Sequence, residues 1–191
     1  MKQQALKYRM YGFVPYQLSG IQAGIQFGHA VVEYQQKYND QYYKKWARKD
    51  KVFVVLNGGT TNNSEPSTMT DIVKQLKINK IKFSIFHEPD LNNALSGIAL
   101  LVDERVFDKE KYKAPVLDSE YLKDIEKIEP KDRMNVIKDI PNKYFEWEPG
   151  DSVLHLKKLL KDYQDWIKSI GGQGNEFLRY YLPKFKLAAS S

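Results

Sequence analysis

The sequence contains no cysteine, which excludes disulfide bonds and any nucleophile or metal site built on thiolates. It also lacks an apolar run approaching the ~20 residues that a membrane-spanning helix needs, and its polar start has no signal-peptide core. We therefore expect a soluble, cytoplasmic protein that does not enter a membrane.

Several familiar catalytic signatures are missing as well. The chain has no glycine-rich dinucleotide motif, no P-loop, no His-Glu-x-x-His and no Gly-x-Ser-x-Gly. The three histidines, His29, His87 and His155, lie far apart in the sequence, which argues against a three-histidine metal site. We expect neither a metal ion nor a cofactor.

The composition is that of an ordinary globular protein with a basic balance. Of 191 residues, 42% are hydrophobic and 28% charged, and the net charge of +6 favours a polyanionic partner without requiring one. The densest basic segment also carries Tyr42, Tyr43 and Trp46, so stacking groups accompany its cations. The candidate nucleic-acid-binding residues there are Lys44, Lys45, Arg48 and Lys49. A solvated helix end is the alternative interpretation.

The order of apolar segments predicts an α/β core. Expected strands lie at 8–16, 51–56, 81–87 and 95–102, and expected helices at 19–38, 41–48 and 68–78. Strands separated by helices indicate crossover connections, so we expect a mixed, mainly parallel sheet flanked by helices. The run at 51–56 is continuously apolar, which is typical of a strand buried on both faces.

Beyond the core the sequence changes to alternating charged residues broken by prolines, so two domains are expected. Residues 1–110 form the α/β domain, and residues 111–191 form a charged, mostly helical extension. Within the extension, a helix with one apolar face is predicted from Asp151 or Ser152 to Ile170, stopped by Gly171 and Gly172. A last helix follows around 177–181. Whether the chain forms a homo-oligomer stays open.

The first predicted helix carries two stripes at the spacing i, i+4, i+7, i+11. The polar stripe comprises Gln22, Gln26, His29 and Glu33, and the stripe of apolar and small residues comprises Ile21, Ile25, Gly28 and Val32. We expect the apolar stripe to enter the core and the polar stripe to line a cleft. Gly24 and Gly28 each destabilise a helix by roughly 1 kcal/mol relative to Ala. Because a helix usually tolerates this loss only where another backbone or a ligand comes close, we expect close packing here. A surface helix with solvated Gln and His residues is the alternative.

A second polar cluster follows the strand at 81–87. Glu88 or Asp90 could position a water or act as a base, and Asn92 and Asn93 could hydrogen-bond a ligand. The loop that begins at Asn57 follows another strand and could meet a ligand with its backbone N–H groups. An ordinary turn is the alternative interpretation of both loops.

The order of these motifs resembles that of the type 2 peptidyl-tRNA hydrolases. In that family a Gly-Lys-x-x-x-Gln-x-x-His-Ala helix follows the first strand, and residues 21–30 match its Gln-x-x-His-Ala end. A Trp-containing segment, two further strands, a helix and a last strand follow in the family's order as far as residue 104. The resemblance implies a cleft for a tRNA or nucleotide ligand, and hydrolysis of the ester between a peptidyl or acyl group and the tRNA 3′ ribose.

The sequence departs from the family where the chemistry is expected. The catalytic lysine falls at Gln22, the loop aspartate falls near Glu88 with Asp90 as a substitute, and the two threonines become Asn92 and Ser96. The candidate catalytic residues are therefore Gln22, Glu88, Asp90 and Asn92, and the candidate ligand-binding residues are Gln26, His29, Asn57, Asn93 and Ser96. Losing the lysine removes a charge-assisted interaction, which favours recognition over catalysis.

Three functions stay open from the sequence. The first is an ester hydrolase acting on peptidyl-tRNA. The second is a non-catalytic binder of an RNA end or a small nucleotide, since divergent members of this fold with helical extensions look like phage or mobile-element proteins that sequester a nucleotide signal. The third is a scaffold whose C-terminal helices bind a protein.

Overall fold

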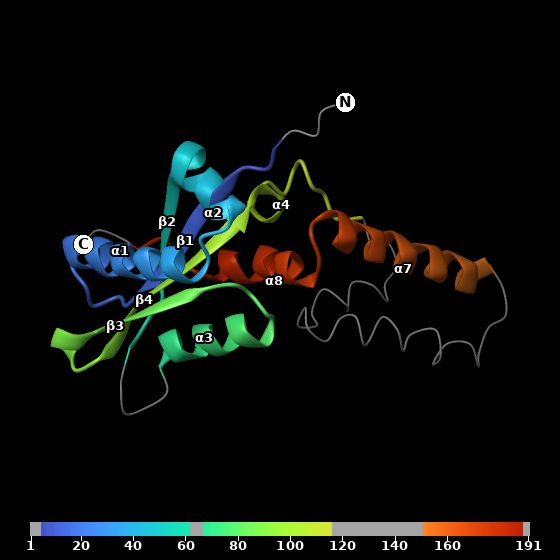
Figure 1. Ribbon diagram of the computed structural model, residues 1–191. Helices are drawn as coiled ribbons and strands as arrows, with labels where there is room; N and C mark the ends of the chain where they lie inside the picture. The colour runs from blue at the N-terminus through green and yellow to red at the C-terminus, as the bar shows by residue number, and fades with distance from the viewer. Residues whose placement is uncertain (1–4, 62–66, 116–150, 189–191) are drawn as a thin grey trace. The chain divides into compact units, whose positions relative to one another are not determined.

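The computed structural model describes residues 5–61, 67–115 and 151–188, and between 151 and 160 it describes only the side chain of Lys158. The chain divides into two compact units (Figure 1). The first contains residues 1–107 and 181–191, and the second contains residues 108–180. The end of the chain therefore returns to the first unit, which the sequence did not indicate.

The first unit is built on a four-stranded sheet with the strand order β2-β1-β4-β3. Its strands are β1 (Tyr8–Val14), β2 (Val52–Asn57), β3 (Ser84–Glu88) and β4 (Ala94–Asp103). β1 pairs with β2 in parallel, whereas the β1–β4 and β3–β4 pairs are antiparallel. The expectation of a mixed sheet flanked by helices is confirmed, but the expectation of a mainly parallel one is wrong. Only a short 3-10 turn joins β3 to β4, and a turn of that length can connect only antiparallel strands.

The helices of the first unit begin at well-formed caps. They are α1 (Gly20–Lys37), α2 (Gln41–Lys45) with a π-helical turn at Trp46–Asp50, α3 (Thr68–Ile78) and α4 (Glu104–Phe107). Ser19 and Gln22 form the capping box of α1, and Ser67 and Thr70 form that of α3. α3 thus spans the residues expected from the sequence. Asp40 caps α2 through the backbone N–H groups of Tyr42 and Tyr43.

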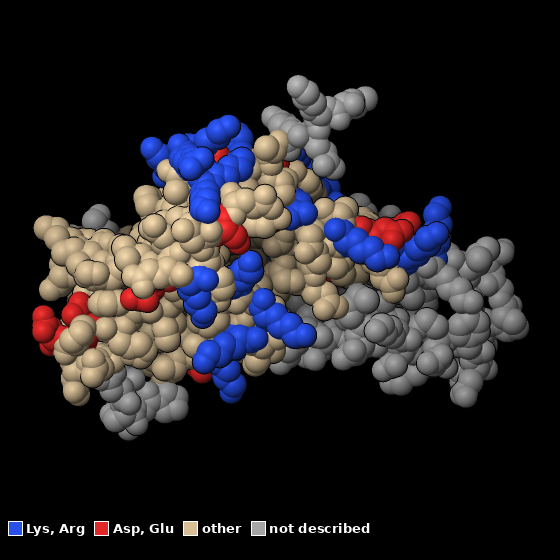
Figure 2. All heavy atoms as spheres, in the orientation of Figure 1, with Lys and Arg blue, Asp and Glu red and all other residues tan. Residues whose placement is uncertain are grey.

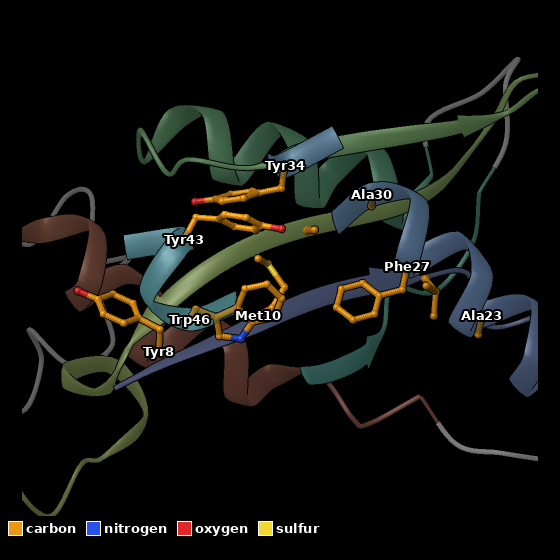
Figure 3. Close-up of a cluster of buried hydrophobic side chains, with 10 residues drawn as sticks. Tyr8, Met10, Ala23, Phe27, Ala30, Tyr34, Tyr43 and Trp46 are labelled. Carbon is orange, nitrogen blue, oxygen red and sulfur yellow. The ribbon is translucent and has the colours of Figure 1, made fainter. Parts of the chain in front are cut away.

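α1 covers one face of the sheet with small and aromatic side chains. These side chains join a cluster of buried residues that also draws on β1 and α2, and Figure 3 shows Phe27, Tyr34 and Trp46 within it. The cluster also includes Tyr8, Met10, Ala23, Ala30 and Tyr43. A Cβ atom at Gly12 would overlap the Phe27 ring, so glycine at this position of β1 lets α1 approach the strand closely. On the opposite face of the sheet, the ring of Phe13 packs edge-on against that of Phe185, with the ring centres 4.8 Å apart. The two faces explain why β1 is buried along most of its length.

Two expectations about burial are wrong. Ile21 is 80% exposed and Ile25 and Val32 are also exposed, so the apolar stripe of α1 faces outward rather than into the core. No atom lies within 4 Å of a Cβ atom built at Gly24 or Gly28, so neither glycine marks a close approach. Both stripes have helical periodicity, and periodicity cannot say which stripe faces the sheet.

The remaining wrong expectation concerns β2, which is an edge strand and not a strand buried on both faces. Its first residues, Val52 and Phe53, are exposed. Its last residues are covered by the returning C-terminal segment, where Asn57 N donates to Lys186 O and Ala188 N donates to Val55 O, both at 2.9 Å. This pairing protects part of an edge that would otherwise be open.

The second unit contains the helices that the sequence predicted for the extension. α7 spans Asp151–Ser169 and α8 spans Gln173–Tyr181, with Gly171 and Gly172 between them at positive φ. The buried residues of these helices include Tyr163, Ile167, Phe177 and Leu178, and Ile170 is buried in the turn between them. The side chains from 151 to 157, on the first half of the predicted apolar face, lie outside the described residues. In the part of the chain that is described, no helix is long and apolar enough to cross a membrane.

Candidate functional site

A buried polar network connects α1 to the hairpin formed by β3 and β4. Ser96 Oγ donates a hydrogen bond to Gln26 Oε1 at 2.6 Å, and Gln26 Nε2 donates to Glu88 Oε2. Ser96 is fully buried and Gln26 is only 6% exposed, whereas Glu88 is half-buried at the end of β3. The network therefore holds one carboxylate in a fixed position where the strand reaches solvent.

The partner that holds Glu88 is a neutral amide and not a cation. In the described part of the chain Glu88 forms no ion pair, and its Oε1 atom accepts only a long contact of 3.4 Å from Asp90 N. An ionised carboxylate has about four acceptor positions on its two oxygens. Glu88 therefore keeps the capacity to accept hydrogen bonds from a ligand.

Next to this network, the His29 ring stacks on Phe86 with ring centres 4.5 Å apart and an angle of 25° between the planes. His29 is exposed although its ring stacks on Phe86, so the residue remains accessible to a ligand. Ser84, Phe86 and Glu88 alternate along β3 and all face α1, since Ser84 Oγ donates to Ala30 O at 2.6 Å. We call this line of contact from Glu88 past Phe86 to Ser84 the α1–β3 seam.

The seam contains a hollow of about 370 Å³, lined by Glu33, Gln36, Lys37, Ser84 and Ile85. Its volume lies near the lower end of the range for small-molecule pockets. Glu33 belongs to the polar stripe seen in the sequence, and Gln36 lies three residues further on the same side of the helix. Gln36, Ser84 and Phe86 were not candidate residues from the sequence, because nothing in the sequence shows which strand lies beside α1.

Gln22 stands apart from the network although it belongs to the same stripe. Its Oε1 atom accepts hydrogen bonds from Ser19 N at 3.2 Å and from Ser19 Oγ at 3.1 Å, and its side chain is exposed. These are the hydrogen bonds of a capping box, so the role visible in the structure is to begin α1. Gln22, a candidate catalytic residue from the sequence, thus has the contacts of a capping residue.

Asp90, Asn92 and Asn93 form the exposed turn between β3 and β4. Asn92 and Asn93 both have positive φ, of 54° and 55°, a conformation that asparagine adopts more readily than most residues. The backbone oxygen of Asn93 lies 2.8 Å from His87 Nδ1. These residues lie close to Glu88 in the chain, and each has a structural role in the turn.

Asn57 lies at the other edge of the sheet. It ends β2, and three strand spacings, about 14 Å, separate β2 from β3. Its Oδ1 atom accepts a hydrogen bond from Gly59 N at 2.8 Å, which shapes the loop that follows. The structure does not bring Asn57 to Glu88.

The basic segment lies at the opposite end of α1 from Glu88. Figure 2 shows Lys and Arg side chains gathered over α2 and beside the end of α3, and acidic side chains at the β3–β4 turn. Lys44, Arg48 and Lys49 are exposed, whereas Lys45 pairs with Asp50 at 2.9 Å. Glu88 contacts α1 at Gln26, and the helix continues to Lys37 before the basic segment begins, so about 17 Å of helix separates the two regions.

Comparison with known proteins adds no family to these observations, because no family model and no curated protein matches the sequence. Among the described residues, no three His, Asp or Glu side chains form a group that could hold a metal ion. The chemistry of the site is therefore that of a fixed carboxylate, an exposed stacked ring and a polar hollow along the α1–β3 seam.

Proposed function

We propose that this chain is a peptidyl-tRNA hydrolase-like protein that binds the 3′ end of a tRNA, or of a similar RNA, without hydrolysing it. The observation that carries the proposal is the Glu88 carboxylate held by Gln26. Two neighbouring hydroxyl groups of a terminal ribose can both donate to such a carboxylate, whereas a terminal phosphate would be repelled by it. The ligand expected at Glu88 is therefore a free ribose end.

The exposed residue His29 supports binding of RNA. Single-stranded bases stack on aromatic and histidine rings, and each stacked base contributes about 1–3 kcal/mol. The His29 ring is already held against Phe86, so little conformational freedom is lost when a base stacks on it.

The exposed cations at the far end of α1 support a strand rather than a single nucleotide. Phosphate groups of an RNA bind Lys and Arg side chains with little dependence on sequence. The distance of about 17 Å along α1 from Glu88 to this segment corresponds to about five nucleotide steps of 3.4 Å. A strand whose 3′ end lies at Glu88 would reach Lys44 and Lys49 with its backbone.

Hydrolysis is not part of the proposal because, among the described residues, no Lys or Arg side chain contacts Glu88 or Gln26, where an oxyanion would need a cation. Gln22 caps α1, and Gln26 already donates to Glu88. Removing one donor aimed at a developing negative charge typically lowers kcat by about 10²–10³-fold, and the charge-assisted donor is the stronger kind.

The direct test measures binding of a fluorescent RNA with a single-stranded 3′ end. One RNA ends in a free 2′,3′-diol and the other carries a 3′-phosphate. We expect the diol RNA to bind more tightly, and Glu88→Gln to remove the preference. Glu110→Gln is the matched control, since Glu110 is an exposed glutamate of the second unit. Equal affinity of the two RNAs for the native chain would overturn the role given to Glu88.

A second arm tests hydrolysis with the same protein. Incubation with peptidyl-tRNA should leave the ester intact at the rate seen in buffer. Turnover that is abolished by Glu88→Gln would contradict the binder and would establish an ester hydrolase with a site lacking the family's lysine.

A further inference from the structure

We propose that the hollow at Glu33 holds one unpaired base of the bound strand and selects cytosine or adenine over uracil. This inference rests on the proposed function, because the strand is the one whose ribose end lies at Glu88. The hollow lies on the same seam, beyond the His29–Phe86 stack. It is a separate subsite with its own chemistry.

The position of the hollow determines which nucleotide it receives. Ser84 lines the hollow and Glu88 ends the same strand, so the two lie four residues apart along β3, about 13 Å. The terminal nucleotide cannot occupy both places. A base in the hollow therefore belongs to a nucleotide that precedes the end of the strand.

The side chains around the hollow combine an acceptor with a donor. The Glu33 carboxylate can only accept hydrogen bonds, and the Gln36 amide can donate as well as accept. Cytosine and adenine each present an exocyclic amino donor next to a ring-nitrogen acceptor, which matches this pair of side chains. Uracil presents a carbonyl oxygen in place of the amino group, and that oxygen would face the carboxylate.

The rest of the lining suits a base with its backbone outside. Ile85 provides an apolar surface, and Ser84 Oγ is already engaged as a donor to Ala30 O at 2.6 Å. Lys37 lies at the rim, where its ammonium group is 3.5 Å from Phe83 O and keeps further donors for a phosphate. A volume of about 370 Å³ is large enough to accommodate a base.

The experiment uses the full chain and three fluorescent eight-nucleotide RNAs. All three end in the same adenosine with a free diol, and the preceding seven positions are cytosine, adenine or uracil. The native chain should bind the cytosine and adenine strands about tenfold more tightly than the uracil strand. Glu33→Gln should reduce this ratio to about twofold or less, whereas Glu110→Gln should leave it unchanged. Circular dichroism spectra establish that each variant is folded.

The outcomes separate this inference from the proposed function. If no strand binds, the proposed function fails. If the strands bind but show no base preference, or a preference that Glu33→Gln leaves unchanged, the base-selecting hollow is overturned while RNA binding stands. If cytidine monophosphate alone binds as tightly as the cytosine strand, the hollow is a nucleotide site and not part of a strand-binding surface.

Discussion

The Glu88 carboxylate determines which way the side-chain amide of Gln26 faces, and the hydroxyl of Ser96 holds the other end of that amide. Ser96 Oγ lies 2.6 Å from Gln26 Oε1, and the other end of the amide lies against Glu88. If the amide were turned over, its oxygen would face the Glu88 carboxylate, and two acceptors without a proton between them repel each other. Ser96, a buried serine on β4, thus holds the Gln26 amide, and this amide positions the Glu88 carboxylate that we assign to the ligand.

A double-mutant cycle of Ser96→Ala and Gln26→Leu measures this relationship. Ser96→Ala should lower the free energy of unfolding by about 1–3 kcal/mol, because the buried amide oxygen of Gln26 loses its donor. With both residues replaced, the total loss should be smaller than the sum of the single losses by about 0.5–3 kcal/mol. Urea unfolding of the four proteins provides the values. Strict additivity would show that the two side chains do not interact.

The sequence predicts the elements of the first unit well because their patterns are local. Apolar runs of strand length, helical periodicity and capping residues place β1, α1, α3 and β4 within a few residues of their observed bounds. What the sequence does not contain is the pairing. The short turn at Pro89–Leu91 makes β3 and β4 a hairpin, and the return of Lys186 to β2 depends on contacts between residues far apart in the chain.

For the candidate site too, the sequence predicts which residues share a helix side but not which strand they contact. Gln26, His29 and Glu33 share one side of α1, as their spacing indicates, and all three lie along the α1–β3 seam. Gln22 shares their spacing but lies in the first turn, where the need to cap the helix determines its contacts. Phe86 becomes visible as a partner of His29 only when β3 is known to lie beside α1.

Replacing two exposed lysines tests the basic segment. Lys44→Gln combined with Lys49→Gln should weaken RNA binding, and the slope of log affinity against log salt concentration should become shallower by about 1.4 for two lost phosphate contacts to a single strand. Affinity measured from low to high salt provides the slope. The pair Lys158→Gln and Lys161→Gln on α7 is the matched control, since both side chains are exposed. An equal change in slope for both pairs would show that binding depends only on net charge.

Asp40 should make the free energy of unfolding of the first unit decrease at low pH. Burial alone raises the pKa of Asp40, but hydrogen bonds from Tyr43 N and from Lys82 outweigh it and hold the pKa below its ordinary value of 3.8. A carboxyl group with a lowered pKa stabilises the fold above its ordinary value and loses that contribution as the pH falls through the folded-state value. We therefore expect the stabilisation from Asp40 to disappear progressively below about pH 4.

Asp40→Asn isolates this contribution, because asparagine keeps the helix cap of α2 and loses the charge. The difference in unfolding free energy between the native chain and this variant should be constant at neutral pH and should shrink below about pH 4. Asp40→Ala should lower the free energy of unfolding by about 1 kcal/mol more than Asp40→Asn, because it also removes the helix cap. A difference that grows as the pH falls would contradict the lowered pKa.

Three glycine substitutions test which glycines mark a close approach, two on the outer side of α1 and one on β4. Gly24→Ala and Gly28→Ala should each stabilise the fold by about 0.5–1 kcal/mol, because the new methyl groups meet no neighbouring atom and alanine favours the helix. Gly97→Ala should instead destabilise it by about 1–3 kcal/mol, since the added Cβ atom would lie 2.5 Å from Gln26 O, where backbone must move. Thermal and urea unfolding measure all three. Destabilisation by Gly24→Ala or Gly28→Ala that grows with protein concentration would show that a second molecule packs on the outer side of α1.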